Sequence, residues 1–394
     1  MNIKDNYKYT LIACYTGYVT QAIVNNFAPL LFLTFQKNWN IPLDKIALLV
    51  AINFGTQLAV DFLSAKFVDR IGYRVSIVAA HIFSAIGLAG LGFFPGLFAD
   101  PYVGLVLAIM LYAIGGGILE VLVSPIVEAC PTEQKSASMS LLHSFYCWGH
   151  VTVVLVSTLF FFAFGINSWK ALACVWAIVP LANALVFTQV PIASLVEGGG
   201  MSIVELIKTR AFWILALLMV CAGAAEQGMS QWSSAFAESG LHVPKMVGDL
   251  AGPCFFAAMM GLSRVFYSKF SERIKLKKFM SASCVLCVVS YLLACLSPLP
   301  ALSLLGCGLC GLSVGILWPG TFSISAATCV TGGTALFALL ALAGDLGCMS
   351  GPTLVGMVSE WAGNNLKVGL LAAIIFPVIL IIGLAISGAK KKPR

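Results

Sequence analysis

Long apolar segments separated by short polar breaks run through the whole chain. About 20 apolar residues at a rise of about 1.5 Å each cross a hydrocarbon core about 30 Å thick. Breaks such as Phe94-Pro95-Gly96 and Gly198-Gly199-Gly200 delimit twelve segments of that kind: 10–36, 45–69, 73–95, 101–128, 136–164, 168–190, 211–239, 247–270, 278–297, 300–326, 332–358 and 366–388. The pattern predicts an all-α membrane protein with twelve transmembrane helices and leaves no room for a long soluble domain.

Composition supports the membrane assignment, since 60% of the residues are hydrophobic and only 10% are charged, far from the average of soluble domains. The N-terminus shows no short apolar region with a small-residue cleavage site, so we expect no cleaved signal. The 13 cysteines lie almost entirely inside apolar segments, where packing is the expected role.

The lysines and arginines are distributed unevenly between the two sides. With the N-terminus inside, 17 of the 23 fall on the inner side, five on the outer side, and Arg264 inside a segment. The positive-inside rule then predicts a multi-pass protein of the cell membrane with both termini cytoplasmic. The net charge of +7 follows from this topology, so we expect contact with membrane lipids and no nucleic-acid partner.

The chain also repeats itself internally. Residues 67–74 resemble residues 270–277, and the acidic positions of the two stretches are 203 residues apart (272 − 69), close to half of the 394-residue chain. A second repeated feature is a glycine eight residues before a proline in each half: Gly117 with Pro125 and Gly311 with Pro319. We therefore predict two pseudo-symmetric six-helix bundles, residues 1–190 and 211–394, joined by a cytoplasmic linker over 191–210.

Ionisable residues inside apolar segments are costly, so each one is a candidate for function. Glu120, His143 and Asp345 are the candidates for proton coupling. Counted by helix rise, Glu120 and His143 lie about 11 to 12 Å above the inner boundary, so they could pair, and Asp345 lies about 20 Å above it. A carboxyl in a poorly solvated cavity can bind and release a proton near neutral pH, which makes Glu120 the first choice. The alternative is a structurally paired carboxylate.

A second group of polar and aromatic residues could bind a solute. Amides and carboxylates satisfy hydroxyl groups, and aromatic rings pack against sugar CH faces. Glu226, Gln227 and Gln231 fall on adjacent faces of one helix, with Trp232 beside them. The other candidates are Asn25, Asn26, Asn53, Tyr146, Trp148 and Trp318. Core packing for the tryptophans and interhelical hydrogen bonding for the asparagines stay open as alternatives.

A third group of charges lies near the inner ends of the segments. Such charges suit a latch that breaks when two bundles rock. The gating candidates are Asp61, Asp69, Arg70, Arg74, Arg264 and Glu272.

One loop carries a family resemblance. The pattern Asp61-x7-Asp69-Arg70-x-Gly72-x-Arg74 resembles the signature loop of the major facilitator superfamily, and 270–277 is similar to its degenerate second copy. Within that superfamily the chain resembles the fucose permease-like, or fucose:proton symporter, group. The stretches that carry this second resemblance are 24–29, 115–125, 142–149, 226–232 and 347–356. The resemblance implies two six-helix bundles, alternating access and proton-coupled sugar transport.

The chain departs from that group at two positions. Fucose permeases have an aspartate four residues before the proline of the first span, and this chain has Asn25 four before Pro29. The asparagine before the proline of the fourth span is Ser124 here, whereas the glutamate of that span is retained as Glu120. The departures leave proton coupling through a single carboxylate as the expectation and argue against fucose itself as the solute.

These observations predict a secondary transporter for a small polar organic solute, such as a monosaccharide or polyol, moved by proton symport through alternating access. The alternatives are a drug or metabolite efflux antiporter and, from another class, a non-transporting receptor or lipid scramblase. No catalytic trio or nucleotide-binding loop occurs, so we expect no enzyme activity, no metal and no cofactor. The coupling ion is expected to be H⁺, with Na⁺ open as an alternative, and the protein is expected to be a monomer.

Overall fold

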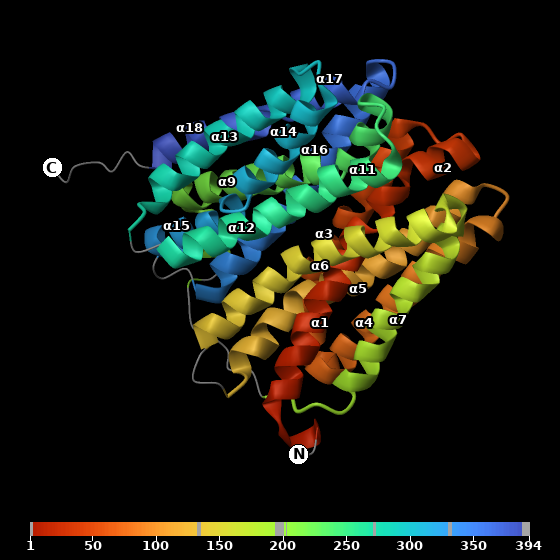
Figure 1. Cartoon of the computed structure of the whole chain (residues 1–394). Helices are drawn as coiled ribbons and strands as arrows, with labels where there is room; N and C mark the ends of the chain where they lie inside the picture. Colours follow the sequence, from red (N-terminus) through yellow and green to blue (C-terminus); the bar gives the residue numbers. More distant parts are fainter. Residues whose placement is uncertain are drawn as a thin grey trace. The chain divides into compact units, whose positions relative to one another are not determined.

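The computed structural model describes residues 3–131, 135–193, 201, 203–270, 273–329 and 333–387, and the regular structure in these ranges is helical. The chain divides into two compact units, Met1–Val196 and Glu197–Arg394, each with its own packed set of helices (Figure 1). The boundary between the units falls inside the segment 191–210 that the sequence marks as a linker.

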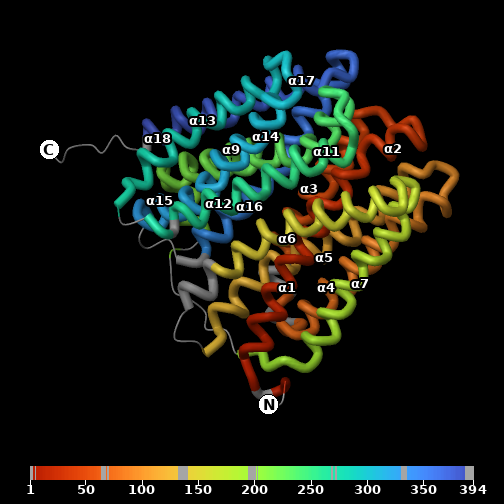
Figure 2. The backbone as a smooth tube through the Cα atoms, viewed as in Figure 1, coloured from red at the N-terminus to blue at the C-terminus, as the bar shows by residue number. Residues whose placement is uncertain are grey.

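The first unit is built from six long helical passages. Helix α4 packs along α5 and α7, and α1 packs against α5 and α6, as the tube in Figure 2 also shows. Helix α3 completes the packing against α5. The helices are α1 Tyr7–Asn26, α2 Phe32–Trp39, α3 Leu43–Ile71, α4 Tyr73–Phe93, α5 Pro101–Ala129, α6 Lys135–Phe164 and α7 Trp169–Phe187.

The second unit centres on α9, which packs against α16 and α18, while α14 packs against α12 and α13. Two π-helical stretches lie in its first two long passages: Phe236–Gly240 ends the first, and Leu250–Cys254 interrupts the second. Its helices are α8 Ile203–Ile207, α9 Arg210–Ser230, α10 Ser233–Ala235, α11 Lys245–Asp249, α12 Phe255–Phe270, α13 Leu276–Leu296, α14 Pro300–Val314, α15 Leu317–Thr328, α16 Gly333–Trp361, α17 Leu366–Ala372 and α18 Ile375–Ser387.

Eleven helical stretches in the described part of the chain are long and apolar enough to cross a membrane. They correspond in order to the second to twelfth predicted segments. The first segment is α1, which is 20 residues long but carries Gln21, Asn25 and Asn26 among its buried residues. The predicted all-α architecture with about twelve spans is confirmed.

Two helices break at corresponding places in the two units. Helix α1 ends at Asn26, before a 3-10 turn over Ala28–Leu31, and α9 ends at Ser230, before the short helix α10. The ends are 204 residues apart (230 − 26), one residue more than the 203-residue offset of the sequence repeat. Discontinuous helices in transporters expose backbone groups beside a binding site, so the residues around both breaks are where a polar site is expected.

Bare backbone at the middle of α5 brings the helices of the first unit close together. A Cβ on Gly115 would collide with Ser84 of α4, and one on Gly116 would lie 2.9 Å from the Gln21 side chain of α1. A Cβ on Gly117 would lie 3.0 Å from Asp61 of α3. Small residues permit such close approach of membrane helices. The same approach places the polar side chains of α1 and α3 against α5.

Candidate functional site

Four buried amides join α1 to α3 in the first unit. Gln21 Nε2 donates to Gln57 Oε1 at 2.7 Å, and Gln57 Nε2 donates to Asn25 Oδ1 at 2.9 Å and to Asn53 Oδ1 at 3.0 Å. Asn53 Nδ2 donates to Asn25 Oδ1 at 3.1 Å. All four side chains are at most 5% exposed. We call Gln21, Asn25, Asn53 and Gln57 the amide cluster.

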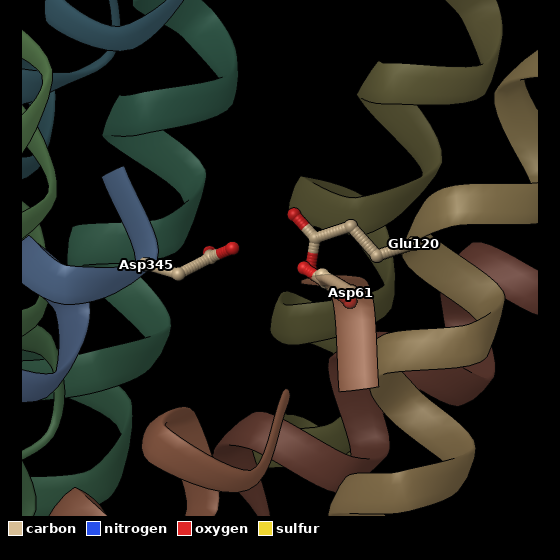
Figure 3. A group of neighbouring side chains, drawn as sticks. All are labelled: Asp61, Glu120 and Asp345. Atoms are coloured by element: carbon tan, nitrogen blue, oxygen red, sulfur yellow. The ribbon is translucent and has the colours of Figure 1, made fainter. Parts of the chain in front are cut away.

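The amide cluster is connected to a pair of carboxyl groups. Gln21 Nε2 also donates to Glu120 Oε2 of α5 at 3.3 Å. A carboxylate oxygen of Asp61 lies within 4.8 Å of one of Glu120, and Figure 3 shows the two carboxyl groups close together. Both side chains are partly buried. Two carboxylates at this spacing repel each other when both are ionised. Their oxygens are also close enough to bind one small cation together.

Further polar side chains of α1 contact α5 and α6. Asn26 Nδ2 donates to the Ala22 carbonyl at 2.9 Å and approaches the Tyr146 hydroxyl at 3.5 Å. The Tyr18 hydroxyl lies 3.2 Å from Ser124 Oγ, and its ring meets His143 edge-on with centroids 5.4 Å apart. Asn26 therefore lies on α1, and Tyr146 and His143 lie on α6, which packs against α1. Trp148, on α6, is exposed.

In the second unit, the polar candidates line the end of α9. Gln231 Nε2 donates to Gln227 Oε1 at 3.0 Å, and Gln227 Nε2 donates to Glu226 Oε1 at 3.3 Å. Glu226 is 6% exposed, and its Oε2 lies 3.8 Å from an Arg264 guanidinium nitrogen on α12. The prediction that Glu226, Gln227 and Gln231 share one region of the helix agrees with these hydrogen bonds.

Arg264 also binds the backbone at a helix break. Its Nε donates to the Gly315 carbonyl at 3.2 Å, and Gly315 lies in the gap between α14 and α15. A guanidinium has no acceptor and five donors, so one side chain can serve both the carboxylate and the carbonyl. The structure thus places Arg264 beside Glu226, a partner that the sequence did not suggest.

The aromatic candidates of the second unit and Asp345 lie around α16. Trp232 is fully buried, and its Nε1 donates to the Pro352 carbonyl at 2.9 Å, so its ring NH is used for packing between elements. Trp318 is partly buried and covers the bare Cα of Gly344. Asp345, the next residue, is 4% exposed. The binding roles predicted for Trp232 and Trp318, and the proton-coupling role predicted for Asp345, stay predictions.

Three of the six gating candidates, Asp61, Arg74 and Arg264, have described side chains. Arg74 Nη1 donates to the Phe187 carbonyl at 2.7 Å and so binds the end of α7. The side chains of Asp69 and Arg70, and all of Glu272, lie outside the described residues. Asp61 lies beside Glu120, so it belongs to the carboxyl pair as well as to the group expected to act as a latch.

Sequence reasoning missed two members of the amide cluster, Gln21 and Gln57. Gln21 precedes Asn25 by four residues, and Gln57 follows Asn53 by four. Residues four apart share a helix face, so this spacing could have identified both. A third omission is the buried Asp249, whose Oδ1 accepts from Ser234 at 2.5 Å and whose Oδ2 lies 3.2 Å from Lys245 Nζ.

Solved structures of transporters share this fold at low sequence identity. The D-xylose-proton symporter superposes with a TM-score of 0.77 at 12% identity, over 98% of each chain. A bacterial homologue of the human lysosomal transporter Spinster gives 0.74 at 15% identity, over 98% of this chain and 97% of that one. The fucose:proton symporter of E. coli gives 0.65 at 14% identity, over 98% and 100%. No curated protein sequence matches the chain.

The family assignment rests on the sequence profile of the Major Facilitator Superfamily, which matches residues 13–352. The match takes in the amide cluster, the carboxyl pair and the polar end of α9 described above. The chain therefore belongs to the major facilitator superfamily, whose members are integral membrane transporters rather than enzymes.

Proposed function

We propose that the protein is a symporter that couples the uptake of a monosaccharide or related polyol to the entry of a proton. The observation that carries the proposal is the hydrogen-bonded connection from Glu120 through Gln21 to the other amides of the cluster. A sugar hydroxyl needs both a donor and an acceptor, and amides supply both. Glu120 supplies the group that takes up the proton. Two of the similar structures are proton symporters of sugars, D-xylose and fucose, in keeping with this class of solute.

In the proposed cycle, the outward-open protein binds the proton and the solute and then opens to the inside. Both termini lie in the cytoplasm, and the protein works as a monomer in the cell membrane. Asp61 shares the role of Glu120, since a proton on one carboxyl lowers the repulsion felt by the other. Na⁺ is the alternative coupling ion.

The proposal is tested by transport in proteoliposomes of the purified full-length chain. We expect an inward proton gradient to drive accumulation of at least one labelled solute from a panel that includes D-xylose, L-fucose and a polyol. In Glu120→Gln, which keeps the shape and removes the titrating group, gradient-driven accumulation should fall to the level of empty vesicles. Exchange of the same solute across the membrane without a gradient should persist. Undiminished accumulation in Glu120→Gln would show that Glu120 is not the proton carrier.

The second candidate is an efflux antiporter for cationic compounds, which the neighbouring carboxyls of Asp61 and Glu120 favour because two carboxylates attract a cation. It predicts proton-driven exchange of an organic cation and no accumulation of sugars in the same vesicles. A receptor or scramblase would show neither activity.

A further inference from the structure

Gln21 has an unusual hydrogen-bonding position at the centre of the first unit. It is 5% exposed, and its Nε2 donates both to Gln57 Oε1 and to Glu120 Oε2. Among the described residues, none donates a hydrogen bond to its Oε1, which faces the bare Cα of Gly116. A buried acceptor without a donor costs about 1–3 kcal/mol, so this arrangement needs an explanation.

When Glu120 is ionised, its charge sets the direction of every hydrogen bond in the amide cluster. An ionised carboxylate can only accept, so Gln21 must present its NH₂ group to it. Gln57 Oε1 then accepts from that same NH₂ group, which leaves Gln57 Nε2 to donate to Asn25 and Asn53. One charge on α5 therefore orients amides on α1 and α3.

We propose that Gln21 is a positioning residue that transmits the protonation state of Glu120 to the amides of Asn25 and Asn53. The inference rests on the proposed function, in which Glu120 carries the coupling proton and those amides bind the solute. The inference adds a route by which proton binding changes the hydrogen-bond donors and acceptors that Asn25 and Asn53 offer to the solute.

The transmission follows from hydrogen-bond polarity. A hydronium ion that protonates Glu120 Oε2 breaks one of its own O–H bonds and leaves as water. The new O–H bond on the carboxyl group turns that oxygen into a donor facing the Gln21 NH₂ group. Rotation of the Gln21 amide brings Oε1, the acceptor without a donor, opposite the new O–H. Gln57 then faces an acceptor and must rotate to donate with Nε2, so that its Oε1 turns toward Asn25 and Asn53.

The consequence is a different set of donors and acceptors in the two protonation states. In the structure, Oδ1 of Asn25 and Oδ1 of Asn53 accept from Gln57 Nε2. After rotation of Gln57, both asparagines must instead donate from Nδ2 to Gln57 Oε1. A solute bound to these amides would then have a different affinity for the protonated and the ionised protein. By linkage, the solute changes the affinity for the proton by the same factor.

The test is infrared difference spectroscopy of the full-length protein in lipid vesicles between acidic and alkaline pH, without solute. We expect a carboxylic acid band that is lost in Glu120→Gln, together with shifts of the side-chain amide bands that isotope labelling assigns to Gln and to Asn. In Gln21→Met, which keeps the length and removes the hydrogen bonds, the Glu120 band should remain and the Asn shifts should be lost. Gln57→Met, a second break in the same chain of bonds, should also lose the Asn shifts. The control Ser84→Ala, which removes a hydroxyl bonded within its own helix, should keep all bands.

The two levels of the proposal fail in different ways. Asn shifts that persist in Gln21→Met and Gln57→Met, or a Glu120 band in the unmodified protein without any amide shift, would overturn the role of Gln21 alone. Absence of a titrating Glu120 band would overturn the proton-coupling function, and the transmission with it.

Discussion

At the scale of single residues, hydrogen bonds between buried polar side chains determine which helices pack against each other, which apolar contacts alone would not. His81 is fully buried, and its Nδ1 lies 2.8 Å from the Ile77 carbonyl, which can only accept. Its Nε2 is therefore the acceptor for Asn183 Nδ2 at 2.8 Å, and Asn183 Nδ2 also donates to the Ala13 carbonyl at 2.9 Å. The imidazole is held as the neutral Nδ1–H tautomer, and α1, α4 and α7 are joined by one asparagine.

Asn183→Ala should destabilise the protein, because it leaves the His81 Nε2 and the Ala13 carbonyl buried without this donor. The Ala13 carbonyl keeps its hydrogen bond within α1, whereas the unsatisfied His81 Nε2 costs about 1–3 kcal/mol, and each kcal/mol lowers Tm by about 2–4 °C in a domain of this size. Thermal unfolding of the detergent-purified protein measures the change. Ser168→Ala, at an exposed hydroxyl, is the control. An unchanged Tm in Asn183→Ala would contradict the connecting role.

The Glu226–Arg264 pair predicts a compensating double substitution. Arg264→Gln removes the cation next to a buried carboxylate, which typically costs about 3–5 kcal/mol. In the double variant with Glu226→Gln the buried charge is gone, so we expect a Tm well above that of Arg264→Gln alone. The comparison of both single variants with the double variant gives the coupling energy. Simple addition of the two effects would show that the ions do not interact.

At the scale of helices, close backbone contact determines how α9 and α16 pack. A Cβ on Gly347 would collide with the Val220 carbonyl, and one on Gly351 with the Ala224 carbonyl. Glycines on one face of α16 thus let the two helices meet at their backbones.

Gly347→Ala should therefore disrupt the second unit, since neither the alanine methyl nor the backbone of α9 can move aside cheaply. Overpacking of this kind typically costs about 1–3 kcal/mol and sometimes more. Fluorescence-detected size exclusion should show a smaller monodisperse peak and a lower Tm. Gly96→Ala, with nothing within 4 Å of the new methyl, should behave like the unmodified protein. Equal behaviour of the two variants would contradict the close contact.

The existence of the helices could be predicted from sequence, but the tertiary contacts at their interruptions could not. A membrane span needs about 20 apolar residues whatever its neighbours are, so hydropathy locates it. In the gap between α14 and α15, Pro319 has no N–H to donate to the Gly315 carbonyl four residues earlier, and the distant Arg264 donates to that carbonyl instead. Likewise, periodicity places Gln21 and Gln57 on polar faces, but only tertiary packing brings those faces together with Glu120.

At the scale of the whole molecule, the distribution of positive charge predicts which loops face the cytoplasm. Lys367, after the turn that ends α16, belongs to the side with few positive charges, whereas Lys208, before α9, belongs to the basic side. A membrane-impermeant maleimide should label Lys367→Cys in intact cells and Lys208→Cys only after permeabilisation. The unmodified protein gives the background from its own thiols, most of which are buried. The reverse accessibility would invert the proposed topology.

The three consecutive glycines of α5 have a mechanical consequence for transport. At Gly115, Gly116 and Gly117 the helix meets three different neighbours, α4, α1 and α3, so closely that an added methyl group would force each of them to shift. Close packing of α5 against three helices opposes movement of these helices relative to one another. The conformational change that carries a solute across the membrane would then be a rigid-body movement of this bundle, without rearrangement of its helices.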